Sequence, residues 1–402
     1  MTVLTESIAF QDSTQFPLEI DLLLCCCRTQ MSAEYAARIH QLVQQNINWN
    51  YLVNTARRHE VIPLLYWQLK NVCPEAVPQD ILNKLRSAFS ANAKKNLAIT
   101  VDLVKILNLF QNHNIPVIAL KGPVLACYAY NNLGLRTFVD LDILVPEEFA
   151  LAAIDLLTEH GYERMYKFKD FQIPRYIKLR NELAFVFESK NFSIDLHWAL
   201  MPEPLRSVSK LLSYENQEIY IGSNKFKIPT LSAESLLLFL CIHSTKHSWS
   251  SLKFVCDLAE VIRSKPELDW KLIESQAESL GTKNILFLGL YLCQELLGTV
   301  LPKEISQKLE ANPQLKIWIS QIKQQLFEAE GRINFFKKHR IYLQTLSWKN
   351  KLSFYFNTLV TPTPYELIMV SLPDWLFPLY YLLRPIRMFV KYSNRLISGS
   401  GA

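Results

Sequence analysis

The chain has 402 residues, of which 50% are hydrophobic and 20% charged, and its formal net charge is +6 at pH 7. This composition excludes an intrinsically disordered chain, and the length is sufficient for a large core and two or three domains. The 10 glycines favour helices over a glycine-rich loop protein, while the mild positive charge is compatible with an anionic ligand without requiring one.

Eight cysteines, three of them consecutive at positions 25–27, show no C-x-x-C spacing that would indicate zinc. The first residues, MTVLTESIAF, lack the basic region and apolar segment of a secretory signal. We therefore expect reduced thiols that fill the core of a cytoplasmic protein.

Helical patterns dominate the first part of the chain. Apolar residues recur every three or four positions from residue 18, which predicts a helical N-terminal lobe over residues 1–95. A further helix is expected up to about residue 114, followed by a short apolar strand at 117–120. The strand ends at Lys121 and Gly122, where a residue without Cβ lets the backbone approach a phosphate and the lysine supplies positive charge.

The next predicted strand, residues 138–145, carries two aspartates among apolar residues. Because side chains alternate in a strand, Asp140 and Asp142 are expected to project from one face. Two carboxylates at that spacing repel each other unless a cation lies between them, and magnesium prefers carboxylates together with phosphate oxygens. Arg136, four residues earlier, is suited either to phosphate contact or to holding the carboxylates in place.

A second acidic strand follows further along the chain. Residues 182–188 and 192–198 read as two strands joined by a hairpin at 189–191. In the second strand Asp195 and His197 share a polar face, so Asp195 is expected to complete a three-carboxylate cluster. It would help to hold the metal and to take the proton from an attacking hydroxyl. His197 is suited to orienting Asp195, to touching substrate, or to a structural role.

The chain from residue 231 onward reads as helical, with Ser232 as the expected cap of the first helix. That helix carries His243 and His247 four residues apart, hence on one face. With Asp257 on the next helix, they are expected to form a structural network or to contact a nucleotide. A zinc site is a more remote alternative, because HEXXH and a third ligand at a suitable distance are lacking.

The C-terminal tail is the most apolar part of the sequence. Pro373, Asp374 and Pro378 interrupt it before the roughly 18 apolar residues that a spanning helix needs have accumulated. Basic residues follow, so the tail is interpreted as packing on the core or on a protein partner. Attachment to the surface of an anionic membrane is the alternative.

Three stretches of sequence, LKGPVLACYAY, LRTFVDLDILV and IDLHWAL, resemble the bacterial family called uncharacterised nucleotidyltransferase, within the DNA polymerase beta-like nucleotidyltransferase superfamily. HSTKHSW and LPDWLFPLYYLLRPIR are also similar to that family, so the resemblance covers most of the chain. The sequence departs from the wider superfamily at Pro123, where serine is common; proline offers neither a hydroxyl nor an N–H to a phosphate.

The resemblance implies an α+β fold, a mostly helical chain around a small mixed β-sheet nucleotidyltransferase core. The expected division is a helical lobe at 1–95, the core at 96–230 and a helical region at 231–402. Asp140, Asp142 and Asp195 are the expected catalytic residues and ligands of Mg²⁺ or Mn²⁺. The expected nucleotide-binding residues are Lys121, Gly122, Arg136, His197, His243 and His247.

The implied activity is metal-dependent transfer of a nucleoside monophosphate from a nucleoside triphosphate such as ATP to an acceptor hydroxyl. The acceptor is a small molecule, a protein or RNA, since the fold does not choose among them. The alternative is a non-catalytic nucleotide-binding module, or a regulatory or partner-binding module, on the same scaffold.

Overall fold

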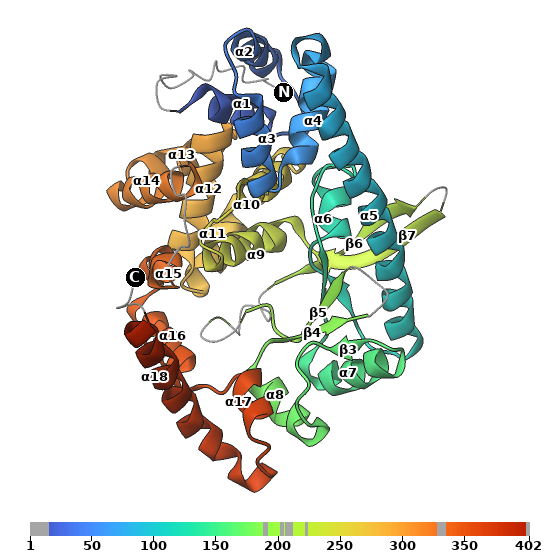
Figure 1. Cartoon of the computed structure of the whole chain (residues 1–402), viewed down its shortest axis with the longest axis vertical. Helices are drawn as coiled ribbons and strands as arrows, with labels where there is room; N and C mark the ends of the chain where they lie inside the picture. The colour runs from blue at the N-terminus through green and yellow to red at the C-terminus, as the bar shows by residue number, and fades with distance from the viewer. Residues whose placement is uncertain are drawn as a thin grey trace.

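The computed structural model describes residues 16–187, 192–201, 205, 212–221, 224–327 and 335–398 (Figure 1). The predicted hairpin connection at 189–191 lies outside the described residues. Helices predominate around one small mixed sheet and a separate two-stranded ribbon, which confirms the predicted fold class.

The sheet has five strands in the order β1-β2-β5-β4-β3. The central pair, β2 and β5, is parallel, and the other pairs are antiparallel. The strands are β1 Ile118–Ala119, β2 Asp140–Leu144, β3 Glu163–Arg164, β4 Glu182–Val186 and β5 Ser193–His197. The ribbon consists of β6 Tyr214–Ile221 and β7 Asn224–Leu231.

Helices of the N-terminal and C-terminal regions pack on each other in one body (Figure 1). The N-terminal helices are α1 Leu18–Cys26, α2 Ala33–Val43, α3 Trp49–Arg58, α4 Ile62–Val72 and α5 Gln79–Asn112, with the 3₁₀ turn η1 Pro74–Ala76. The C-terminal helices of this body are α9 Ala233–Lys246, α10 Leu252–Ser264, α11 Trp270–Ser279, α12 Lys283–Leu297, α13 Lys303–Glu310, α14 Pro313–Phe327 and α15 Phe335–Thr345. Ser232 caps α9 by accepting a hydrogen bond from the Ser235 amide, as predicted.

Shorter helices surround the sheet: α6 Pro123–Tyr128, α7 Ala150–Glu159 and α8 Ile173–Leu179, with the 3₁₀ turns η2 Glu147–Phe149 and η3 Asp170–Gln172. The chain closes with α16 Trp348–Val360, α17 Pro364–Met369, the 3₁₀ turn η5 Asp374–Leu379 and α18 Tyr380–Ser398. None of the described helices is long and apolar enough to cross a membrane.

Two clusters of buried hydrophobic side chains hold these elements together. One joins α1–α4 to α9–α15, and the other lies between the sheet and its own helices. The long helix α5 contributes to both, with Leu85 in the first cluster and Phe110 in the second. The division at residues 95 and 230 stays a prediction, and α5 passes through the first of those boundaries.

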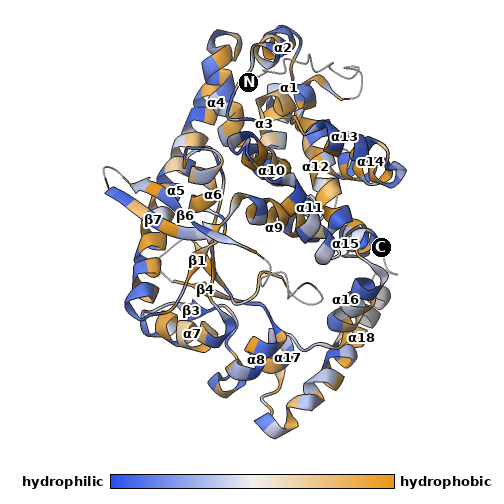
Figure 2. Ribbon diagram, turned by 180° about the vertical axis from the view of Figure 1, so that it is seen from behind, coloured by the Kyte–Doolittle hydropathy of each residue, from blue (hydrophilic) through white to orange (hydrophobic). Residues whose placement is uncertain are grey.

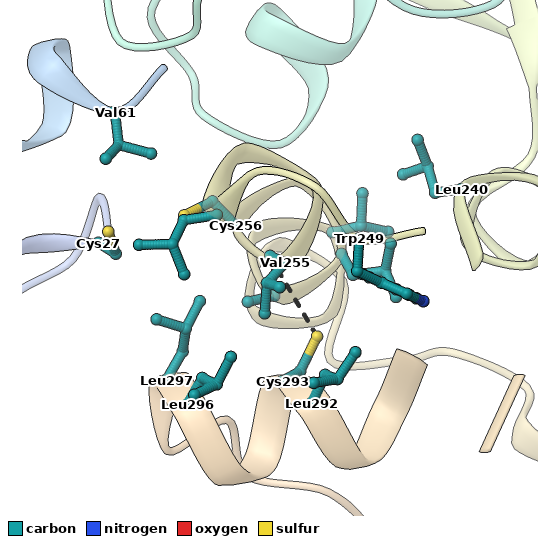
Figure 3. Close-up of a cluster of buried hydrophobic side chains, with 14 of the residues drawn as sticks. Cys27, Val61, Leu240, Trp249, Val255, Cys256, Leu292, Cys293, Leu296 and Leu297 are labelled. Carbon is teal, nitrogen blue, oxygen red and sulfur yellow. Dashed lines mark hydrogen bonds between the residues drawn. The ribbon is translucent and has the colours of Figure 1, made fainter. Parts of the chain in front are cut away.

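The consecutive cysteines belong to the first cluster, as predicted. Cys25, Cys26 and Cys27 are buried and free of disulfides. Figure 3 shows Cys27 and Cys256 among aliphatic side chains that include Leu296 and Leu297 of α12. Their thiols therefore serve as small apolar groups.

Candidate functional site

The parallel pairing of β2 with β5 brings the three predicted carboxylates together. Asp142 is directly opposite Asp195 in the register, and Asp140 lies one alternation earlier on the same strand face. The intervening residues, such as Leu141 and Ile194, point into the hydrophobic cluster beneath the sheet. All three aspartates line a cavity of about 270 Å³.

The cavity lies between the sheet and helices α9 and α10 of the helical body. The sheet side supplies the aspartates and also Glu182 at the start of β4. The helical side supplies Lys246 and Lys253, and aromatic rings that include Phe239 and Phe254. An acidic wall thus faces a wall that is basic and aromatic.

Asp142 is a buried carboxylate with partners on only one of its two oxygens. Lys121 Nζ lies 3.0 Å from Oδ1, and His197 Nε2 lies 3.3 Å from the same atom. Burial alone would raise the pKa of Asp142, but the charge of Lys121 and the hydrogen bond and charge of His197 hold that pKa well below its usual range. Oδ2 is buried without a hydrogen-bond partner, an unfavourable position for a carboxylate oxygen unless a ligand occupies it.

His197 bridges two carboxylates. Its Nδ1 lies 3.2 Å from Glu182 Oε2, while Nε2 faces Asp142. Burial lowers the pKa of His197, but the two carboxylates outweigh it and raise the pKa to about 9, so the ring is an imidazolium at neutral pH. In return, the adjacent charge of His197 overcomes burial and holds the pKa of Glu182 well below its usual range.

The pKa of Asp195 is shifted in the opposite direction to that of Asp142. Burial, followed by the neighbouring negative charge of Asp142, raises the pKa of Asp195 to about 6. Two facing carboxylates therefore differ in basicity: Asp142 is held as an anion, while Asp195 can accept a proton near neutral pH.

Arg136 forms its main contacts with Asp257 of α10. Its Nε and Nη2 donate to the two carboxylate oxygens of Asp257, both at 2.8 Å, and Tyr130 Oη donates to Asp257 at 2.7 Å. Asp257, which sequence analysis grouped with His243 and His247, forms a buried, bidentate pair with Arg136. The guanidinium still lines the cavity.

His243 of α9 and His247, which directly follows that helix, line the cavity. The ring of His243 lies 4.5 Å from that of His247, and His243 Nε2 is 3.3 Å from Lys121 Nζ. Burial, the charge of Lys121 and the proximity of His247 lower the pKa of His243, so its imidazole is neutral. His247 stacks on Phe254, with ring centroids 5.8 Å apart.

Gly122 forms the turn between β1 and α6. Its φ of 59° and ψ of −123° form a combination that side chains disfavour, and Pro123 occupies the first turn of α6. A Cβ at this position would lie 3.4 Å from the carbonyl oxygen of Asp140. The turn therefore lies against the acidic strand, next to Lys121.

Three further charged residues of the cavity were missed by sequence analysis. Glu182 was assigned only to a strand, and the structure pairs it with His197 across β4 and β5. Lys246 and Lys253 lie within helical patterns, where a lysine ordinarily indicates a solvated face. Their only signal in the sequence was proximity to His247: Lys246 lies one residue before it and Lys253 six residues after it.

The donor atoms at the acidic wall fit a divalent cation. Carboxylate oxygens of Asp140, Asp142 and Asp195 are the ligand type that Mg²⁺ and Mn²⁺ prefer. Asp142 Oδ2 has no hydrogen-bond partner and is therefore available to a cation. Within the described ranges, however, no group of three or more His, Cys, Asp or Glu side chains is arranged to hold a metal ion.

A mostly helical chain with acidic residues on neighbouring strands beside a glycine turn is typical of nucleotidyltransferases. Residues 45–298 match the model of the family described as uncharacterised nucleotidyltransferase. That match spans more than half of the chain, so the protein belongs to this family.

Two solved structures show a remote likeness to the chain. One is the lincosamide antibiotic adenylyltransferase LnuA bound to lincomycin, with 17% identity and a TM-score of 0.27, covering 40% of this chain and 93% of the other. The second is an antigenic nucleotidyltransferase-like protein from Paracoccidioides brasiliensis, with 14% identity and a TM-score of 0.32, covering 54% and 98%. A comparison with curated protein sequences found no match.

Proposed function

We propose that the protein transfers a nucleoside monophosphate from a nucleoside triphosphate to an acceptor hydroxyl. The main support is the cavity itself, in which Asp140, Asp142 and Asp195 face lysines across a space of about 270 Å³. The family to which the chain belongs agrees with this chemistry.

The triphosphate would lie against the basic residues of the cavity. Lys246 and Lys253 supply charge from the helical side, and Lys121, next to the Gly122 turn, supplies it beside the acidic strand. Because Asp257 occupies Nε and Nη2 of Arg136, contact between this side chain and a phosphate oxygen would fall to Nη1.

The base would lie against the aromatic side of the cavity. Phe239, His247 and Phe254 line it, and His247 and Phe254 are already stacked. An aromatic wall accepts any base, since each has a π-face. His243, neutral beside Lys121, is placed to hydrogen-bond the nucleotide.

In the proposed reaction the acceptor oxygen attacks the α-phosphorus and the bond to the bridging oxygen of the β-phosphate breaks. Pyrophosphate leaves, and the hydroxyl proton passes to Asp195 as general base. Lys121 and His197 keep Asp142 anionic throughout. A divalent cation held by the three aspartates would supply positive charge at the phosphates. The rest of the rate acceleration would come from holding the acceptor and the triphosphate in the reactive orientation.

The test is transfer of label from α-³²P triphosphates, offered one base at a time with Mg²⁺ or Mn²⁺, to components of a cell lysate. The chain with both Asp140→Asn and Asp142→Asn serves as the inactive variant, and Asp80→Asn on the exposed start of α5 is the matched control. We expect label to enter one fraction with the unaltered protein and the control, and to fall by at least about 10²-fold in the double variant.

Calorimetry of Mg-ATP binding separates the enzyme from a binding module. Binding that persists in the double variant, together with no labelled product from any triphosphate, would favour the non-catalytic nucleotide-binding or regulatory alternative and contradict the proposal.

A further inference from the structure

We propose that the C-terminal arm, formed by α16, α17, η5 and α18, attaches the protein to the surface of an anionic lipid bilayer. The arm lies at the edge of the molecule, with α16 and α18 side by side in both views (Figures 1 and 2). The proposal concerns where the protein acts and is independent of the proposed chemistry.

The arm presents hydrophobic residues to solvent at helical spacing. On α18 these are Leu382, Ile386 and Phe389, the last 76% exposed. α16 carries a comparable stripe, and α17 adds to it. The exposed members on these two helices are Trp348, Leu352, Tyr355, Phe356, Leu359, Tyr365, Ile368 and Met369.

A buried ion-pair cluster lies on the inner side of the arm. The Glu366 carboxylate is 1% exposed and pairs with Arg384 and Arg387 of α18. Arg384 also donates to the carbonyl of Thr358 on α16. Polar groups inside and apolar groups outside reverse the arrangement expected of a surface helix in water, and indicate an apolar environment on the outer side.

The arm is fixed to the sheet region by its inner residues, so its outer face has a defined orientation. Tyr380 is fully buried and bonds Gln172, and Arg180 donates to the carbonyl of Pro362. Arg175 forms an ion pair with Asp374. These contacts leave the hydrophobic outer side exposed among the described residues.

The net positive charge of the C-terminal segment favours an anionic lipid. Residues 331–402 contain ten Lys and Arg but only two acidic residues, so this segment carries +8 while residues 1–330 carry −2. Basic residues beside an apolar helical face are attracted to anionic headgroups. A contact between two copies through this face would instead bring two +8 segments together, which is unfavourable.

Two exposed tryptophans add to this assignment. Trp375 in η5 is 77% exposed, and Trp348 at the start of α16 is 67% exposed. Indole rings favour the headgroup region of a bilayer, where one edge meets water and the body is apolar. Because the apolar stripes are short and proline interrupts α18, the arm lies along the surface without spanning it.

The test is flotation of the full chain with vesicles of phosphatidylcholine alone or of phosphatidylcholine with phosphatidylglycerol. One variant combines Leu382→Asp, Ile386→Asp and Phe389→Asp. The matched control combines Val300→Asp and Ile317→Asp, which are also exposed apolar positions but lie on the helical body. Circular dichroism and thermal unfolding establish that both variants fold.

We expect the unaltered chain and the control to float with the anionic vesicles, and binding to weaken with added salt. The arm variant should bind at least about tenfold more weakly. Absence of flotation with the anionic vesicles overturns the proposal, as does equal flotation of the arm variant. A dimer that the arm variant dissociates, in a protein that ignores vesicles, would assign the face to a second copy instead.

Discussion

Asp142 and Asp195 lie opposite each other on neighbouring strands and yet have different affinities for a proton. Asp142 is stabilised as an anion by Lys121 and His197, whereas Asp195 has the repulsion of Asp142 added to the cost of burial. Part of the fold's stability is therefore given up at this site when no cation is bound.

Replacing Asp195 with asparagine should stabilise the metal-free protein at pH 7. Its folded-state pKa of about 6 lies above the ordinary 3.8, so ionisation of Asp195 opposes folding. The penalty is small below about pH 4, grows as the pH rises from the unfolded-state pKa to the folded-state pKa, and levels off at about 3 kcal/mol near neutral pH. Urea unfolding of Asp195→Asn and the unaltered chain in EDTA, at pH values from 4 to 7, measures the difference.

Magnesium should stabilise the unaltered chain more than it stabilises Asp195→Asn. A cation that neutralises the carboxylates should raise the unfolding temperature of the unaltered chain, and raise that of Asp195→Asn by less. Asp80→Asn, an exposed aspartate paired with Lys84, is the control and should respond like the unaltered chain. A destabilised Asp195→Asn with no dependence on pH would contradict this account of the residue.

At the scale of single elements, a buried ion pair connects two parts of the site. Arg136 precedes β2 and Asp257 belongs to α10, so their bidentate contact ties the acidic strand to the helical wall of the cavity. The sequence placed both residues near the site. It could not pair them, because their contact depends on how α10 packs 121 positions further along the chain.

Asp257→Asn should lower the free energy of unfolding by about 3–5 kcal/mol, since it leaves the Arg136 guanidinium buried without its counter-charge. Arg136→Met together with Asp257→Leu should cost less than the sum of the two single changes. Asp80→Asn in the exposed pair with Lys84 should change it by no more than about 0.5 kcal/mol. Chemical denaturation measures each of these variants, and additive losses would show that the pair contributes little.

Gly122→Ala should lower stability by about 1–3 kcal/mol because the backbone at this turn has φ of 59° and ψ of −123°. The strain should also displace Lys121 and weaken nucleotide binding. The cause is conformational, since a Cβ would meet the Asp140 carbonyl oxygen at an ordinary contact distance of 3.4 Å. Thermal unfolding and Mg-ATP calorimetry test the two effects. An alanine variant with unchanged stability would show that the turn relaxes.

The register of β4 against β5 could not be predicted from the sequence. A three-residue connection at 189–191 would place Leu183 opposite His197, whereas the structure places Glu182 there. A shift of one residue sends every side chain to the other face of the sheet. Alternation within β2 and β5 was therefore sufficient to predict Asp140, Asp142 and Asp195 on polar faces, but not to predict the contact between Glu182 and His197.

At the scale of the whole molecule, the cavity lies between two hydrophobic clusters. They are built largely from different elements, although α5 contributes to both. The aspartates project from the sheet and its cluster, while Lys246, His247 and Lys253 come from α9, α10 and the chain between them. A ligand that fills the cavity must contact both. The lysines were not predictable from sequence, because a position on a helix becomes part of a site only when another cluster packs against it.

Mg-ATP should therefore slow amide hydrogen exchange on both sides of the cavity at once. We expect protection in the strands that carry Asp140 and Asp195 and also in residues 239–257, because bound ligand favours the closed contact between the two regions. At a ligand concentration about 100 times the dissociation constant, the stabilisation should reach about 2.7 kcal/mol, a roughly hundredfold slower exchange where opening of the cavity is rate-determining. Replacing both Lys246 and Lys253 with glutamine should reduce the protection of the helices more than that of the strands, because these side chains connect the nucleotide to α9 and α10. Protection confined to the strands in the unaltered protein would show that the ligand binds the sheet alone, and that the helical wall does not take part.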